Sequence, residues 1–136
     1  MLRSSDLLSA EARPRAKGQT ALVMEDHGPM RETAVQVLRR GGYQVLEASD
    51  AEDAQRLAAA NPNIRLLLAD FSARETNGLA LARWFQARSP ETRILITTGS
   101  LWELLCEAGE DEPFGILVKP FSEDQLRRMV QRLAGS

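Results

Sequence analysis

Short apolar runs alternate along the chain with longer segments in which apolar residues recur at helical spacing. The apolar runs, which we expect to form β-strands, cover residues 21–24, 43–48, 64–69, 93–98 and 115–118. Because these runs are so apolar, a sheet built from them needs a cover on both faces. Helices on both faces of a parallel sheet supply that cover, and right-handed crossovers leave few topologies. The alternation therefore predicts an α/β fold with a doubly wound, five-stranded parallel sheet and five helices.

Local signals mark the helices between these strands. Ser49 followed by Glu52 has the spacing of a capping box, in which two residues three apart accept hydrogen bonds from each other's backbone. Ser122 and Gln125 have the same spacing ahead of the last helix. We expect helices near residues 29–40, 51–60, 79–87 and 101–108, and after Ser122.

The first 19 residues differ from the rest of the chain. They are rich in Ser, Ala and Arg, and Pro14 and Gly18 interrupt any helix that could begin there. We therefore expect a flexible tail or linker over residues 1–19 and one folded domain over residues 20–134.

Charge and cysteine content narrow the classes of function. The net charge is −2, so nothing favours binding to nucleic acid or to an anionic membrane. No run approaches the roughly 20 apolar residues that span a bilayer, and the N-terminus lacks the apolar core of a secretory signal. The single cysteine, Cys106, excludes an internal disulfide and fits a reducing cytoplasm, where we expect it to be a packed thiol.

Polar side chains follow four of the expected strands. Glu25 and Asp26 follow the first strand and Asp70 the third, while Thr98 ends the fourth and Lys119 follows the fifth. In a doubly wound sheet these strand ends meet at one edge, where ligands bind. Two like charges 4 Å apart repel by about 4 kcal/mol at an effective dielectric constant of 20. A divalent cation would relieve this repulsion, and a site made of oxygen ligands favours Mg²⁺.

This pattern suggests phosphoryl transfer. A carboxylate such as Asp70 can attack phosphorus and form an acyl phosphate. Lys119 would provide a compact positive charge for a phosphoryl oxygen, and Thr98 a hydroxyl donor. A single acid at a strand end is more often a helix cap, and a Lys-Pro pair is usually a loop. The hypothesis therefore depends on the order of these residues along the strands.

Residues 20–134 resemble the receiver domain of bacterial response regulators, which has a flavodoxin-like fold. The resemblance is carried by the stretches ALVMEDHGPMR, LLLADFSARETNG, ILITTG and ILVKPFS. The family has an acidic pair after its first strand and a phosphorylated Asp after its third. A Gly lies eight residues further on, a Thr or Ser follows the fourth strand, and Lys-Pro follows the fifth. The matching residues here are Glu25, Asp26, Asp70, Gly78, Thr98, Lys119 and Pro120.

The resemblance implies a role for each site residue. Asp70 would be the phosphoacceptor, and Asp26 and Asp70 would bind Mg²⁺. Glu25 would act on the metal directly or through a bound water, and the backbone carbonyl of Ser72 would be the third protein ligand. The bond between Lys119 and its following proline would be cis.

The resemblance also implies the partners. The phosphoryl group would come from a phosphohistidine on a sensor histidine kinase or a histidine phosphotransfer protein. The output would be protein contact, without nucleic acid or membrane, and a weak homodimer stays open. We expect a signalling domain rather than an enzyme, with self-catalysed phosphotransfer and slow dephosphorylation. The runs LRRGGYQVLEASDAEDA and TTGS are similar to receivers at the C-termini of hybrid sensor histidine kinases.

Two departures from the family pattern support an alternative. Ile116 stands where the family often has an aromatic residue that moves on phosphorylation, and Phe114 is expected on the other face of the strand or in the preceding loop. The dipeptide at residues 73–74 is Ala-Arg rather than Met-Pro. The alternative is an interaction module that has the fold but does not switch. A Mg²⁺ phosphatase is disfavoured, because such enzymes carry a second acid where this chain has Ser72.

Three other side chains carry weaker signals. The lone histidine, His27, is expected to be a solvated loop residue, and Trp84 to be packed on the sheet or half-exposed. Trp102 follows Thr98 closely. We expect ordinary core packing for it, with a partner surface formed with Leu101, Leu104 and Leu105 as the alternative.

Overall fold

The computed structural model describes residues 18–71, 78–109 and 112–135. Its strands and helices, in chain order, are β1 (Thr20–Met24), α2 (Gly28–Arg40), β2 (Gln44–Ala48), α3 (Ala51–Ala60), β3 (Ile64–Phe71), α4 (Gly78–Arg88), β4 (Arg93–Thr98), α5 (Leu101–Ala108), β5 (Gly115–Val118) and α6 (Glu123–Ala134). All strand pairs are parallel, and the strand order in the sheet is β2-β1-β3-β4-β5. The predicted α/β fold with a doubly wound, five-stranded sheet is confirmed.

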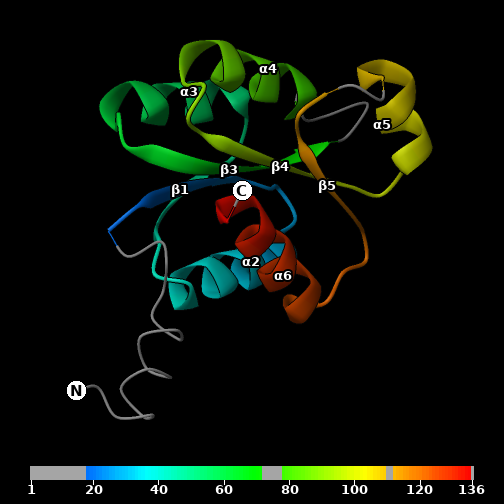
Figure 1. Cartoon of the computed structure of the whole chain (residues 1–136), viewed down its shortest axis with the longest axis horizontal. Helices are drawn as coiled ribbons and strands as arrows, with labels where there is room; N and C mark the ends of the chain where they lie inside the picture. The colour runs from blue at the N-terminus through cyan, green and yellow to red at the C-terminus, as the bar shows by residue number, and fades with distance from the viewer. Residues whose placement is uncertain (1–17, 72–77, 110–111, 136) are drawn as a thin grey trace.

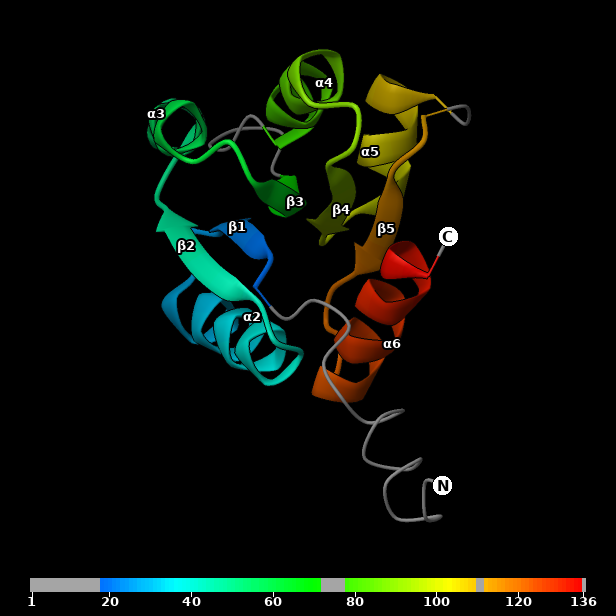
Figure 2. The same ribbon diagram turned by 60° about the vertical axis from the view of Figure 1, so that its left-hand side comes forward.

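Two layers of helices cover the sheet. Helices α2 and α6 lie on one face, and α3, α4 and α5 lie on the other (Figures 1 and 2). Successive side chains of a strand point to opposite faces. In β3, Leu66 and Leu68 accordingly join the core beneath α2 and α6, while Leu67 and Ala69 join the core beneath α3, α4 and α5.

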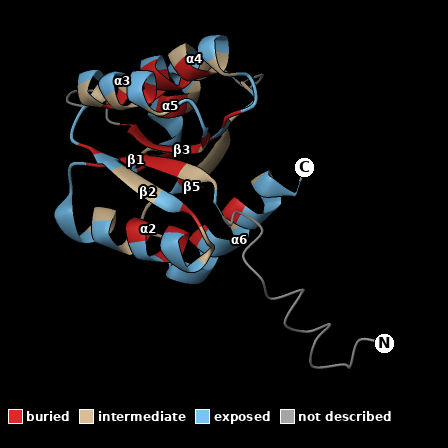
Figure 3. Cartoon of the chain, turned by 90° about the vertical axis from the view of Figure 1, so that its left-hand side faces the viewer, coloured by how far each residue is buried: buried red, intermediate tan, exposed pale blue. Residues whose placement is uncertain are grey.

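Burial is deepest in the central strands. Residues 21–24 of β1 are 0% exposed, and Figure 3 shows buried residues along the middle of the sheet. Each fully buried Leu or Val contributes about 1.5–3 kcal/mol relative to an exposed one. The outer strands β2 and β5 are more exposed, which follows from polar residues such as Gln44 and Glu47 in β2. None of the helices in the described part of the chain is long and apolar enough to span a membrane.

Two predicted helix caps have different outcomes. The predicted Ser122–Gln125 capping box is present, with hydrogen bonds of 3.0 Å and 2.7 Å. The capping box predicted for Ser49 and Glu52 is wrong. Asp50 caps α3 instead, because its carboxylate accepts a 2.7 Å hydrogen bond from the backbone N–H of Asp53.

Helix α5 corrects two expectations. Cys106 is exposed rather than packed, and Trp102 is 75% exposed rather than part of the core. This short helix has a single buried residue, Leu104. Residues two positions away from Leu104 lie about 200° around the helix and face solvent. Together with Leu101 and Val118, which are 40% and 41% exposed, Trp102 belongs to the exposed large apolar side chains of the described residues.

His27 and Trp84 lie as expected, each with an added contact. His27 is exposed, and its Nδ1 accepts a 3.3 Å hydrogen bond from Met30 as the N-cap of α2. Trp84 is half-buried, and the guanidinium of Arg88 lies 5.1 Å from its ring centre. Trp84 also packs edge to face against Phe85 of the same helix, and it lies against the core beneath α3, α4 and α5.

Gly78 is required by a close approach of backbones. A Cβ at this position would lie 2.2 Å from the carbonyl oxygen of Asp70, whereas a Cβ at Gly28 would meet nothing within 4 Å. Both glycines begin helices, so Gly28 is a matched control.

We predict that Gly78→Ala lowers the free energy of unfolding by about 3 kcal/mol, because backbone atoms must move to relieve the overlap. Gly28→Ala should leave stability unchanged or raise it by about 0.4–1 kcal/mol. Urea denaturation of both variants measures the difference. Equal stability of the two variants would contradict the predicted clash.

Candidate functional site

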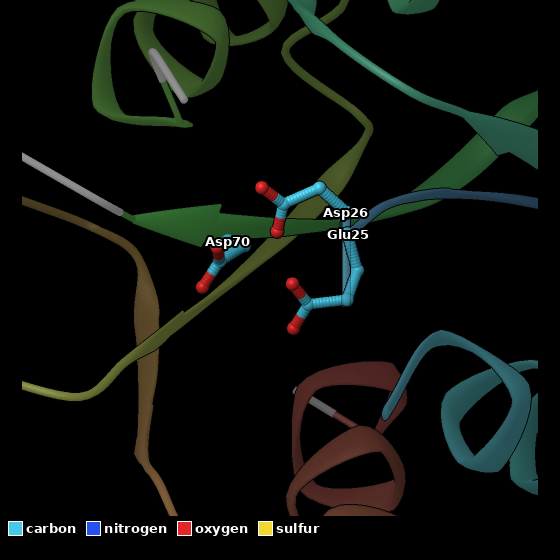
Figure 4. A group of neighbouring side chains, drawn as sticks. All are labelled: Glu25, Asp26 and Asp70. Carbon is cyan, nitrogen blue, oxygen red and sulfur yellow. The ribbon is translucent and has the colours of Figure 1, made fainter. Parts of the chain in front are cut away.

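Three carboxylates meet where β1 and β3 end. Glu25 and Asp26 directly follow β1, and Asp70 is the second-last residue of β3 (Figure 4). One oxygen from each carboxylate can be chosen so that all three lie within 4.8 Å of one another. Glu25 and Asp70 are 1% and 5% exposed, whereas Asp26 is exposed. The sequence prediction that these acids converge is therefore matched by the structure.

Backbone and side-chain contacts hold Glu25 in the buried position. The N–H of His27 donates a 3.4 Å hydrogen bond to Glu25 Oε2, and Arg31 Nη1 donates a 3.0 Å bond to the Glu25 carbonyl. Arg31 also forms a 3.3 Å ion pair with Glu47 on β2. Arg31 was not predicted from the sequence. It is one turn into α2, and no motif marks its contact with the β1–α2 connection.

Lys119 bridges the two buried acids. Its Nζ lies 2.6 Å from Asp70 Oδ1 and 2.7 Å from Glu25 Oε1. The backbone N–H of Lys119 donates a 2.7 Å hydrogen bond to the carbonyl of Thr98, and the Lys119–Pro120 bond is cis, as the resemblance implied. Glu25 Oε1 is fully buried, and its contact with Lys119 is an ion pair.

Protonation at the site follows from these contacts. Burial raises the pKa of Glu25 above its usual 4.5, and the Asp70 charge adds to this, while the bond to Lys119 opposes it. For Lys119, burial favours the neutral form, but the close contacts with Asp70 and Glu25 and the charges of these two acids together outweigh it. The pKa of Lys119 therefore lies above its usual 10.5. Among the described residues, the charged Lys119 thus contacts two of the three clustered carboxylates.

The two threonines at the end of β4 face opposite sides of the sheet. Asp70 is in register with Thr97, and Phe71 is in register with Thr98. Thr97 Oγ1 donates a 3.5 Å hydrogen bond to Asp70 Oδ1. The Thr98 hydroxyl, predicted as the site donor, instead forms two 3.0 Å hydrogen bonds with the backbone of Ser100. Thr97 was not predicted from the sequence, because the strand register that distinguishes the two adjacent threonines is not visible there.

Two further expectations concern the surroundings of the site. Ser72, whose carbonyl is the predicted third metal ligand, lies outside the described residues, as does the dipeptide at 73–74. Phe114 was expected either in the loop before β5 or on the face of β5 opposite Ile116. It lies in the loop and packs, like Ile116, against the core beneath α3, α4 and α5. The loop placement is therefore confirmed, and the opposite-face placement is wrong.

We predict that Lys119→Met destabilises the metal-free protein by about 3 kcal/mol at pH 8, because removing one partner leaves buried charge without compensation. Without Lys119 the pKa of Glu25 rises further above its unfolded value. Ionising Glu25 in the folded variant then lowers the free energy of unfolding. This loss is absent below pH 4.5, the pKa of Glu25 in the unfolded chain, and it grows as the pH rises through the higher pKa of the folded state.

Urea denaturation in EDTA at pH 5 and pH 8 measures this effect. The deficit of Lys119→Met should be smaller at pH 5. Arg128→Met is the matched control, since Arg128 pairs with Asp124 on the exposed surface of α6 and such pairs contribute little. A deficit of equal size at both pH values would contradict the assignment of the cost to Glu25.

Comparison with known proteins agrees with this geometry. The family model of the response regulator receiver domain matches residues 21–131. The chemotaxis protein CheY1 of Helicobacter pylori is 31% identical over 122 residues, which are 85% of this chain and 96% of CheY1. The response regulator protein PilR of Pseudomonas aeruginosa is 31% identical over 114 residues, which are 82% of this chain but 25% of PilR.

Solved structures agree in fold. The response regulator TrrA of Thermotoga maritima, solved in complex with Mg²⁺–BeF, has a TM-score of 0.72. It is 23% identical, and the match covers 85% of this chain and 98% of that chain. From its sequence match and its fold, this chain belongs to the response regulator receiver domain family.

Proposed function

We propose that this chain accepts a phosphoryl group on Asp70 from a phosphohistidine, in a Mg²⁺-dependent reaction, and signals through protein contact. The donor would be a sensor histidine kinase or a histidine phosphotransfer protein. The reaction would take place in the cytoplasm. The observation that carries the proposal is the position of Lys119 Nζ, 2.6 Å from Asp70 Oδ1 and 2.7 Å from Glu25, beside three clustered carboxylates.

The donor set fits a hard divalent cation. The clustered side-chain ligands are all carboxylates, and one oxygen of each lies within 4.8 Å of the others. Asp26 and Asp70 would hold Mg²⁺, with Glu25 binding directly or through water and the Ser72 carbonyl as a further ligand. The bound ion would supply positive charge against the phosphoryl oxygens. A structural relative, TrrA, has been solved with Mg²⁺–BeF.

The chain's own residues would carry out the transfer. A carboxylate oxygen of Asp70 attacks phosphorus, and the bond between phosphorus and the imidazole nitrogen of the donor breaks with its electron pair on nitrogen. Lys119 then pairs with a phosphoryl oxygen in place of one of its carboxylate contacts. The Thr98 hydroxyl would leave Ser100 for the phosphoryl group and draw the β4–α5 connection inward.

Output would involve the start of α5. This helix begins three residues after Thr98, and its first residues, Leu101 and Trp102, are exposed. A shift of the β4–α5 connection would therefore move an exposed apolar surface, the usual character of a protein contact site. The alternative, a module that does not switch, is favoured by Ile116. This side chain is smaller than the aromatic residue often found there and packs against the core.

Mg²⁺ should stabilise the protein through the acidic cluster. At 100 times its dissociation constant, a bound ion adds about 2.7 kcal/mol to the free energy of unfolding. Asp26→Asn removes one ligand charge and one source of repulsion. We therefore predict an unchanged or higher melting temperature for this variant in EDTA and a much smaller rise with Mg²⁺. Thermal melts of both proteins in EDTA and in MgCl₂ test this, and equal rises would count against the cluster as the metal site.

Phosphorylation itself is measured by intact mass. After incubation with acetyl phosphate and Mg²⁺, the wild-type protein should gain one phosphoryl group, and EDTA should abolish the gain. Asp70→Asn should show no gain, because an amide is not a nucleophile of this kind. Asp124→Asn, which changes an exposed acid on α6, should behave as wild type. Folded wild-type protein that gains no mass would support the module that does not switch.

A further inference from the structure

We propose that the Thr97 hydroxyl shortens the lifetime of the phosphorylated state by donating a hydrogen bond to the Asp70 carboxylate as it leaves phosphorus. The inference rests on the proposed function of Asp70. The Thr97 hydroxyl faces Asp70, the proposed phosphoacceptor. The Thr98 hydroxyl instead bonds to Ser100 in the connection between β4 and α5.

The contact is built into the register of the sheet. Asp70 and Thr97 are paired residues of neighbouring parallel strands, so their side chains project to the same face. Leu68 and Leu95, two residues earlier in each strand, share the core beneath α2 and α6 and confirm which face this is. Thr97 cannot turn toward the other face without a shift of the whole strand.

The Thr97 hydroxyl faces Asp70 inside the protein. Thr97 is 0% exposed, and its Oγ1 donates to Asp70 Oδ1 at 3.5 Å, which is longer than the usual O–H···O distance of about 2.5–3.0 Å. The structure gives this hydroxyl no other hydrogen-bond partner among the described residues. Lys119 donates to the same oxygen, so two donors among the described residues bond to Oδ1.

A donor at this position favours the carboxylate over the acyl phosphate. In hydrolysis, a water oxygen forms a bond to phosphorus and the bond from phosphorus to Asp70 breaks. The electron pair of that bond returns to the carboxylate, and the water proton leaves with the phosphate. Negative charge therefore grows on the Asp70 oxygens in a loose transition state. A hydrogen bond from Thr97 to the departing carboxylate stabilises that charge, because bonds to ionised acceptors are stronger than bonds to a neutral carbonyl.

The forward reaction should respond differently. Asp70 is already a carboxylate before it attacks phosphorus, and in a loose transition state it keeps most of its charge. The hydrogen bond from Thr97 is then similar in the ground and transition states, so it changes the rate of phosphorylation little. Loss of the hydroxyl should slow hydrolysis selectively. A general disturbance of the site would slow both reactions.

The experiment uses the full chain, labelled to completion with acetyl phosphate and Mg²⁺, and follows intact mass after the donor is removed. Thr97→Val keeps the shape of a branched strand residue and removes the hydroxyl. We expect dephosphorylation about fivefold slower, as for the loss of one hydrogen bond, with the labelling rate within about twofold of wild type. Thr97→Ser restores the hydroxyl and should restore the wild-type lifetime. Thr92→Val is the control, because its buried hydroxyl bonds Ile64 at the opposite end of the strand.

Each outcome of this experiment either supports or overturns the role of Thr97 in dephosphorylation. Slower dephosphorylation in Thr97→Val, with rescue in Thr97→Ser and none of the effect in Thr92→Val, supports the proposal. Equal lifetimes in Thr97→Val and wild type overturn it and leave the function of Asp70 intact. Equal slowing of labelling and hydrolysis also overturns it, because a structural disturbance then accounts for the effect. Wild-type protein that takes up no label overturns both the proposed function and this inference.

Discussion

The bridge from Lys119 to Asp70 and Glu25 is the interaction on which the site depends. Two carboxylates that are 1% and 5% exposed lie at the same edge of the sheet, and the ammonium group touches both at 2.6–2.7 Å. Without that cation the two acids would repel each other in a poorly solvated place, and burial already raises the pKa of Glu25. With it, Lys119 stays charged, since its pKa lies above 10.5. Asp26, the third carboxylate of the cluster, lies beside these two acids, and the three side chains offer the oxygen ligands that a divalent cation favours.

The sheet supplies the geometry that makes this bridge possible. Lys119 follows β5, Asp70 lies in β3 and Glu25 follows β1, and these strands are not all neighbours in the order β2-β1-β3-β4-β5. Strand β4 separates β3 from β5, so the long Lys119 side chain reaches across it. The register of β3 with β4 then decides which of two adjacent threonines meets Asp70. Position in the sheet, rather than residue type, separates the roles of Thr97 and Thr98.

The sequence predicts the fold well because each strand is a nearly unbroken apolar run and each helix has a distinct pattern. It also predicts that Glu25, Asp26, Asp70 and Lys119 come together, since parallel strands in one sheet end at one edge. It does not predict contacts that depend on register or on packing between elements. Thr97 and Arg31 were missed for this reason.

Helix α5 shows a second limit of sequence reasoning. The stretch LWELLC has apolar residues around most of the helix, so its pattern does not reveal which side is buried. Leu104 alone is buried, and Cys106 and Trp102 face outward. The close approach that requires Gly78 is likewise a tertiary contact, here with the Asp70 carbonyl. The sequence showed that glycine only as part of a family pattern.

The central claim, that Asp70 itself carries the phosphoryl group, is tested most directly at the level of the residue. Borohydride reduces an aspartyl phosphate to homoserine, which marks the modified side chain permanently. After treatment with acetyl phosphate, Mg²⁺ and borohydride, peptide mass mapping should find homoserine at position 70 and unmodified acids at positions 25 and 26. Homoserine at another position, or none in protein that has gained a phosphoryl mass, would contradict the assignment of Asp70.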